Sequence, residues 1–179
     1  MGSNGLTSAR HDVFCNVYRK KYPETYDENL PEDLIYSGSK KFTDTVDGVE
    51  LNAGKLVLSP TRTYAPIINK ILSKIGRDCI DGIIHCSGGA QTKVLNFIEN
   101  LHVIKDSLFD IPPLFEMIQK ESETPWKEMY QVFNMGHRME IYVDEKFANH
   151  IISISKSFDI DAKVIGKVEK SDIKNLTIL

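Results

Sequence analysis

Three short segments of the sequence combine glycine with side chains that can bind an anion. The first is "GSNG", residues 2–5, ahead of an amphipathic pattern. The second is "HCSGGAQTK", residues 85–93, between an apolar run and a second such pattern, and the third is "FNMGHRM", residues 133–139. Glycine lets the backbone come close to a ligand, and the first amides of a helix favour a negative charge. We therefore expect these segments to bind a phosphate or another anion.

Individual side chains near these glycines suit the same role. Arg62, in "SPTRTY", is the strongest single candidate, because a guanidinium presents paired donors to phosphate oxygens. Asn134 tolerates unusual backbone angles and can hydrogen-bond a ligand, and Gly136 allows a tight turn beside it. The candidate binding residues are Ser3, Asn4, Gly5, Arg62, Ser87, Gly88, Gly89, Lys93 and Gly136, and the candidate catalytic residues are His85 and Asn134.

Each feature also has an ordinary structural explanation. The first segment can be a helix N-cap, "SGGA" a plain turn, and Asn134 with Gly136 a helix C-cap. His85 can be a hydrogen-bonded histidine of a sheet, and Lys93 and Arg62 can be solvated surface side chains. The glycines fit neither the P-loop pattern nor the dinucleotide-binding pattern, and no Ser/His/Asp order or zinc-ligand spacing occurs. The residues alone indicate a phosphate-binding domain with no complete catalytic apparatus and no metal ligands.

Composition narrows the class of protein and its partners. The chain has 179 residues, 41% of them hydrophobic and 26% charged, with a formal net charge of -3. These values are typical of a globular domain, and no overall basic field attracts nucleic acid or a membrane. The cysteines Cys15, Cys79 and Cys86 show no metal-binding or paired spacing, and no apolar stretch approaches a membrane span. We expect a cytoplasmic protein with reduced thiols and neither nucleic acid nor membrane as a partner.

Hydrophobic periodicity predicts an α+β fold, with a mixed β-sheet and helices packed on it, in a single domain over residues 1–179. Residues 24–47 form a long excursion with little periodicity. The expected helices cover residues 7–20, 63–75, the region after the glycines, 112–122, 124–133 and 145–158. Thr63, Thr124 and Asp144 are the expected N-caps of the second, fifth and sixth helices. The inward side chains are expected to include Val94, Phe97, Ile98 and Leu101 after the glycines, and Phe158 in the last helix. The expected strands are 33–36, 55–58, 80–86 (central in the sheet), 138–143, 162–168 and 176–179.

Five motifs follow one another in an order that resembles a known family. They are "GSNGL", "LSPTRTYAP", "IHCSGGAQTKVLNFI", "PPLFEMIQ" and "EMYQVFNMGHRM". The chain resembles, over nearly its whole length, the C-terminal domain of the aminoimidazole ribonucleotide synthetases, also called phosphoribosylformylglycinamidine cyclo-ligases. The resemblance implies an enzyme of purine biosynthesis. ATP would activate the formyl amide oxygen of formylglycinamidine ribonucleotide as a phosphate ester, and the amidine nitrogen would then displace phosphate and close the imidazole ring.

The resemblance also implies roles for residues and partners. Ser3, Asn4, Gly5, Arg62 and the amides of residues 87–89 would hold the ribose phosphate and the formylglycinamidine chain, with Asn134 and Gly136 near the reacting end. Members of the family are homodimers that require Mg²⁺, and their N-terminal half supplies most of the ATP and metal site. That half would lie upstream of Met1, so we expect the isolated chain to be inactive.

Two positions depart from the family pattern. Many members have a histidine directly before "SNG", where this sequence has Gly2, and a third glycine where it has Ala90. Either His11 or His85 replaces the missing histidine, or this chain works without one. Two other classes of function stay open. One is a related ATP-dependent enzyme, resembling selenophosphate synthetase, thiamine-phosphate kinase or formylglycinamidine ribonucleotide synthase, and the other is a non-catalytic phosphate-binding module.

Overall fold

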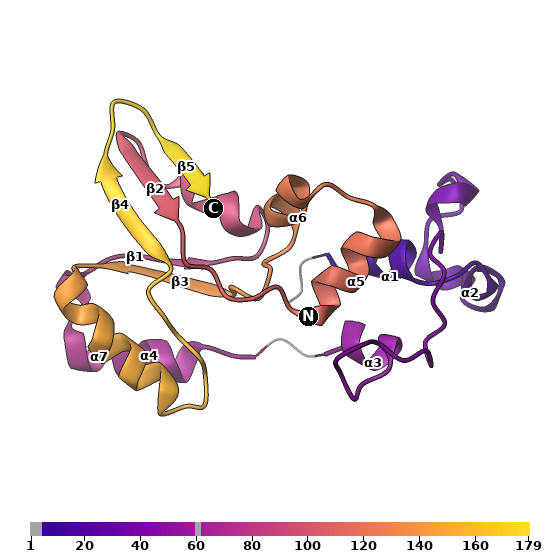
Figure 1. Ribbon diagram of the computed structural model, residues 1–179, viewed down its shortest axis with the longest axis horizontal. Coiled ribbons are helices and arrows are strands. Elements are labelled where there is room, and N and C mark those ends of the chain that lie inside the picture. Colours follow the sequence, from indigo (N-terminus) through magenta and orange to yellow (C-terminus); the bar gives the residue numbers. More distant parts are fainter. Residues whose placement is uncertain (1–4, 60–61) are drawn as a thin grey trace. The chain divides into compact units, whose positions relative to one another are not determined.

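The computed structural model describes residues 5–59 and 62–179 and confirms the α+β class (Figure 1). The chain forms two compact units. Unit 1 comprises residues 1–61, 87–91 and 111–136, and unit 2 comprises residues 62–86, 92–110 and 137–179. The single domain over residues 1–179 stays a prediction, and the two units are described separately.

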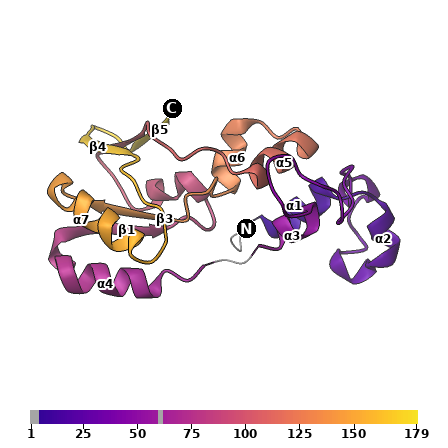
Figure 2. The same cartoon turned by 60° about the horizontal axis from the view of Figure 1, so that its bottom comes forward.

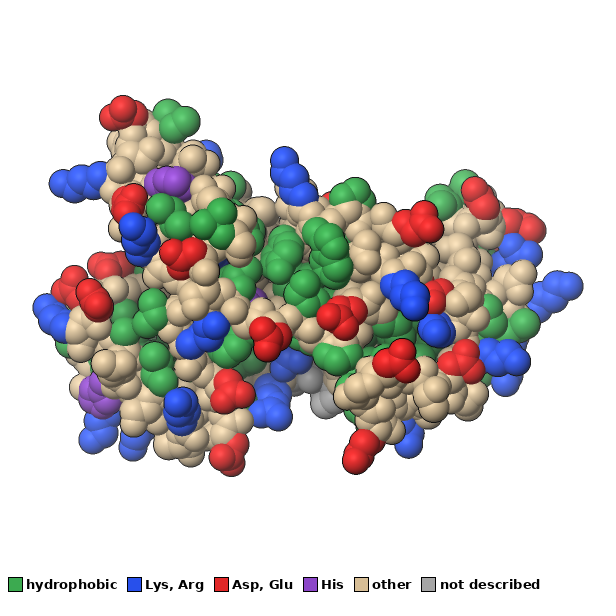
Figure 3. All heavy atoms as spheres, viewed as in Figure 1, with side chains coloured by type: hydrophobic (Ala, Val, Ile, Leu, Met, Phe, Trp, Pro, Cys, Tyr) green, Lys and Arg blue, Asp and Glu red, His purple; other side chains and the backbone are tan. Residues whose placement is uncertain are grey.

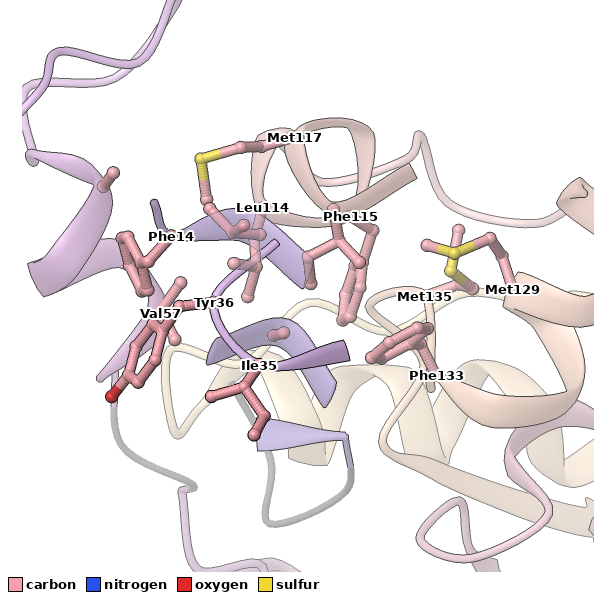
Figure 4. Close-up of a cluster of buried hydrophobic side chains, with 14 residues drawn as sticks. Phe14, Ile35, Tyr36, Val57, Leu114, Phe115, Met117, Met129, Phe133 and Met135 are labelled. Atoms are coloured by element: carbon pink, nitrogen blue, oxygen red, sulfur yellow. The ribbon is translucent and has the colours of Figure 1, made fainter. Parts of the chain in front are cut away.

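Unit 1 is helical, and its apolar core forms between helices that are far apart in sequence. Helices α1 and α5 pack together, and Phe14, Tyr36, Phe115 and Phe133 are among the buried side chains of this core (Figure 4). Its helices are α1 (Leu6–Val13), α2 (Val17–Lys21), α3 (Ala53–Val57), α5 (Pro113–Ser122) and α6 (Trp126–Val132), with 3₁₀ helices at Pro23–Thr25 and Glu32–Leu34.

The single helix expected over residues 7–20 is wrong, because the chain breaks at Phe14. Phe14 has extended backbone angles and forms a β-bridge with Lys40. The amide of Cys15 donates to the carbonyl of Lys40 at 2.9 Å, and the amide of Lys40 donates to the carbonyl of Val13 at 3.0 Å. The bridge replaces helical hydrogen bonds and places the Phe14 ring against Phe42, with centroids 4.6 Å apart.

Two expected strands of unit 1 are also helical. Residues 55–58 belong mostly to α3, where the Asn52 side chain accepts a hydrogen bond from the amide of Lys55 and the buried Ala53 and Val57 lie one turn apart. Of the strand expected at 33–36, residues 33 and 34 belong to the 3₁₀ helix Glu32–Leu34, and Ile35 follows it with extended backbone angles.

The helices expected at 112–122 and 124–133 are confirmed as α5 and α6. Thr124 is not the N-cap of α6, however. Pro125 takes that position, and the Thr124 hydroxyl accepts a hydrogen bond from Ser122.

Unit 2 contains two β-sheets and two long helices. Strand β1 (Ile80–His85) pairs antiparallel with β3 (Met139–Val143), so the expected central position of β1 is wrong for the residues described. Strand β2 (Leu101–Lys105) lies between β4 (Gly166–Lys170), which is antiparallel to it, and β5 (Asn175–Ile178), which is parallel, and these three strands form the mixed sheet. Helices α4 (Ala65–Ile75) and α7 (Glu145–Lys156) pack against β1 and β3 (Figure 2).

The ends of these elements follow local chemistry. Gly76, with φ 92°, ends α4 as expected, but Tyr64 rather than Thr63 is its N-cap. Asp144 is the N-cap residue of α7, although its side chain makes no capping hydrogen bond. Phe158 lies beyond α7 and is 40% exposed, so its expected inward position is wrong.

The α-helix expected after "SGGA" is a 3₁₀ helix, η4 (Ala90–Asn96). Val94 is buried as expected, but Phe97 is 69% exposed and Leu101 begins β2.

The surface and the helix lengths agree with the composition. Acidic and basic side chains are interspersed on the face shown in Figure 3. Within the described ranges, every helix is too short or too polar to cross a membrane.

Candidate functional site

Parts of the three glycine-containing segments that the structure describes lie together in unit 1. Gly5 is the N-cap of α1, with φ 78°, and a Cβ added to it would lie 2.2 Å from Cε1 of Phe133. The Gln91 side chain donates from Nε2 to the carbonyl oxygen of Asn134 at 2.9 Å. The start of α1, the "SGGA" loop and the turn after α6 therefore lie together, although 128 positions of sequence separate Gly5 from Phe133.

The turn after α6 is held by its own asparagine. Asn134 is 4% exposed, and its Oδ1 accepts a hydrogen bond from the amide of Gly136 at 2.9 Å. Met135 and Gly136 have φ of 51° and 90°, and Phe133 is the C-cap of α6. Asn134 and Gly136 thus form an Asx turn beyond the helix, and the explanation of these two residues as a helix C-cap is wrong.

The "SGGA" loop has an unusual backbone. Gly88, Gly89 and Ala90 have φ of 34°, 83° and 41° in succession. A Cβ added at Gly88 would meet no atom within 4 Å, so the loop is open on that side. Successive amides in such a turn can form an anion-binding concavity. Ala90 adopts a left-handed conformation that glycine tolerates better, which explains why a glycine suits this position.

A second group of candidate residues lies in unit 2, around an open pocket of about 530 Å³. Arg62 and His85 both line it, beside the N-terminus of α4. The rings of Tyr64 and His85 lie edge to face with centroids 6.5 Å apart, and Ile83 and Met139 contribute apolar wall. A cation, two rings and a helix N-terminus around one pocket are suited to an anionic ligand that also has a planar or apolar part.

Two cationic candidates of unit 2 already have partners. Arg62 donates from Nη1 to the carbonyl of Asp159 at 3.3 Å, which holds its exposed side chain near the pocket. Lys93 donates from Nζ to the carbonyl of His85 at 3.0 Å, at the end of β1. Lys93 therefore stabilises the end of the strand that carries His85.

The buried histidines differ from His85, which is exposed. Burial lowers the pKa of His137 to about 4, and the cations of Lys105 and Lys163 act in the same direction. His137 Nε2 accepts a hydrogen bond from the amide of Phe109 at 3.0 Å, so the neutral ring belongs to the interior of unit 2.

His11 is buried in unit 1, with its ring 5.0 Å from that of Tyr36. Burial, assisted by the Arg10 guanidinium, lowers its pKa. It lies six residues after Gly5, which is about 9 Å along a helix. This position makes His11 a weaker substitute for the missing family histidine than a residue beside Gly5 would be.

The sequence reasoning missed two features. Gln91 is fully buried and connects two of the glycine-containing segments, but its sequence neighbourhood gives no signal of burial. Lys105 and Glu140 form a buried ion pair. The burial of Lys105 could have been predicted, because Lys105 lies two residues after the apolar Val103 in the same strand and its side chain therefore points to the same face.

The structure divides the predicted site residues as follows. Gly5, Ser87, Gly88, Gly89, Asn134 and Gly136 are in unit 1, whereas Arg62, His85 and Lys93 are in unit 2. Ser3 and Asn4 lie outside the described residues. The role of each residue stays a prediction.

Comparison with known proteins identifies the family. Residues 38–178 match the family described as "AIR synthase related protein, C-terminal domain". The chain belongs to this family. It is 32% identical to a phosphoribosylformylglycinamidine cyclo-ligase of Caldicellulosiruptor saccharolyticus, over 96% of this chain and 46% of the relative. Relatives of the same name in Syntrophus aciditrophicus and Methanocaldococcus jannaschii are 32% and 35% identical, over 80% and 68% of this chain and 42% and 36% of the relatives.

These matches confirm the resemblance recognised from the five motifs. The chain spans less than half the length of these curated relatives.

Proposed function

We propose that this chain is the C-terminal half of a phosphoribosylformylglycinamidine cyclo-ligase and that it binds formylglycinamidine ribonucleotide. The observation that carries the proposal is the meeting of three motif segments in unit 1, where Gly5 contacts Phe133 and Gln91 binds Asn134. A binding site that uses all three segments requires them to lie together in this way. The names of the relatives support the same activity.

Two groups of residues can bind the phosphate of this substrate. The amides of the "SGGA" loop in unit 1 offer backbone donors, and Arg62 in unit 2 offers a guanidinium beside a helix N-terminus. Substitution of Arg62 tests the second group alone, whereas Gly88→Ala tests the first. Asn134 and Gly136 keep their proposed place near the reacting end, His85 stays a candidate catalytic residue, and these two substitutions decide which group binds the phosphate.

ATP and Mg²⁺ are proposed for the whole enzyme and not for these residues. Across residues 5–59 and 62–179, no group of three or more His, Cys, Asp or Glu side chains could hold a metal ion. We derive no step through the metal from this chain, because Mg²⁺ is bound through one or two carboxylates together with substrate phosphates rather than by a cluster of protein groups alone. In the proposal, the remaining half of a homodimeric cytoplasmic enzyme of purine biosynthesis supplies the nucleotide and metal site.

Thermal unfolding of the purified chain tests the proposal. A ligand that binds only the folded state raises the midpoint, and at 100 times Kd the gain is about 2.7 kcal/mol, or several degrees. We expect a rise with formylglycinamidine ribonucleotide and none with Mg²⁺-ATP. A rise with Mg²⁺-ATP alone would contradict the proposed division of ligands, and no rise with either would contradict substrate binding by this chain.

The same assay separates the rival functions. Selenide with ATP, thiamine phosphate and formylglycinamide ribonucleotide are the ligands of the related enzymes, and a midpoint shift with one of these alone would favour that enzyme. A non-catalytic module would bind the ribonucleotide but give no aminoimidazole ribonucleotide when the chain is combined with the N-terminal half of a relative and Mg²⁺-ATP. Product formation in that mixture would establish the cyclo-ligase.

A further inference from the structure

Unit 2 contains a buried ion pair that the proposed function does not use. Lys105 Nζ on β2 donates to Glu140 Oε1 on β3 at 2.5 Å, and the two side chains are 1% and 4% exposed. The Tyr142 hydroxyl donates to the other carboxylate oxygen at 2.6 Å. Glu140 also interacts with the buried Cys86 thiol, whose pKa is raised mainly by burial and then by this carboxylate.

Such a pair is a poor source of stability. Removing two charges from water carries a large desolvation penalty, and well-packed apolar residues of similar size are often as stabilising or more so. The best-attested use of a buried polar pair is to select one register among several that apolar packing alone would accept. The surroundings fit that use, because Ile84, Val94 and Val103 supply apolar contacts beside the pair.

The pairing register of β1 and β3 determines which side chains line the pocket. Glu140 lies opposite Ile84, and the next pair along the strands is His85 opposite Met139. Successive side chains point to opposite faces, so His85 and Met139 line the pocket while Glu140 faces Lys105. A slip of one residue would exchange these faces.

The residue-by-residue pairing of β1 with β3 is interrupted once. The pairing shifts between Ile80 and Gly82, at the far end from His85.

Ile84 of β1 and Val103 of β2 belong to one apolar cluster, so the pair joins β3 to two strands that already pack together. We propose that the Lys105–Glu140 pair thereby fixes the register of β3 in its ladder with β1 and holds Met139 opposite His85 in the pocket wall. Glu140 is a positioning residue in this proposal, since it acts through the strand. The ligand-binding part of the inference rests on the proposed function, whereas the register part does not.

The test replaces both charges with apolar side chains of similar size, Lys105→Met with Glu140→Leu, and adds Tyr142→Phe so that the hydroxyl that donates to Glu140 is not left without its acceptor. We expect an unfolding midpoint no lower than that of the parent chain, together with loss or doubling of the nuclear Overhauser contacts between His85 and Met139. The control, Lys167→Met with Glu169→Leu, removes an exposed pair of the same unit and should change neither result. Lys105→Arg with Glu140→Asp keeps the charges and should keep one register. A single unchanged set of contacts in the apolar variant would overturn the proposal.

Ligand binding supplies a second readout. The Kd for formylglycinamidine ribonucleotide should rise about twofold in the apolar variant if two registers are equally populated, and more if the original register is lost, without a fall in midpoint. If the parent chain binds, Arg62→Ala weakens binding and the apolar variant binds normally, the register proposal fails and the proposed function stands. If the parent chain does not bind, the proposed function fails, and the Overhauser contacts still decide the register proposal.

Discussion

Gly5→Ala tests whether the start of α1 lies against Phe133, and the structure predicts the size of its effect. Gly5 has φ 78°, and a left-handed conformation costs a non-glycine residue about 1–2 kcal/mol. The lower entropy of alanine in the unfolded chain offsets about 0.5–1 kcal/mol of this. The new methyl would lie 2.2 Å and 2.6 Å from ring carbons of the buried Phe133, and such overpacking costs about 1–3 kcal/mol. The free energy of unfolding should fall by about 1–4.5 kcal/mol.

A matched control separates the two contributions. Gly48 has a similar φ of 76°, but a Cβ added there would meet no atom within 4 Å. Urea unfolding of Gly48→Ala therefore reports the backbone contribution alone, about 1 kcal/mol or less. Equal losses for the two variants would refute the contact between Gly5 and Phe133, and with it the meeting of the first and third segments. Combining Gly5→Ala with Phe133→Leu should relieve the clash, giving a coupling of about 1–3 kcal/mol.

Three further predictions concern other parts of the site. Arg62→Ala should raise the Kd for formylglycinamidine ribonucleotide about tenfold, or about 1.4 kcal/mol, by calorimetry, while the midpoint stays unchanged because the side chain is exposed. Ala90→Gly should change the free energy of unfolding by less than about 1 kcal/mol in urea, because relief of the left-handed backbone at φ 41° opposes the loss of a buried methyl, and a loss of more than about 2 kcal/mol would contradict the strained backbone. His137 is protonated more readily in the unfolded chain, so its contribution is complete above pH 6.5 and is lost as the pH falls to about 4. The parent chain should therefore lose about 3 kcal/mol more over this range than His137→Gln, and equal pH profiles would contradict the burial of His137.

Long amphipathic segments were predictable from the sequence. The periodicity of residues 64–75 and 145–156 gave α4 and α7, and alternation gave β3. In these segments local preference and burial agree, because one face of each element is apolar and packs on the core.

Short segments were not predictable, because tertiary contacts override local preference there. The helix expected over 7–20 breaks so that Phe14 can form a bridge with Lys40 and pack on Phe42. Residues 55–58 are apolar enough for a strand, but the Asn52 cap and the burial of Val57 favour a helix. A run of four apolar residues has no periodicity long enough to choose between the two.

By itself, the sequence determined the family, the α+β class and the chemistry of the candidate groups, because motif order and residue type are properties of the chain. Only the tertiary structure decided which groups meet. Gly5 contacts Phe133 and Gln91 binds Asn134 in unit 1, whereas Arg62 and His85 share a pocket in unit 2. It also decided that Lys105 and Glu140 are buried together. The physical reason is that contact depends on how the elements pack, and no local preference specifies the partner of a side chain many residues away.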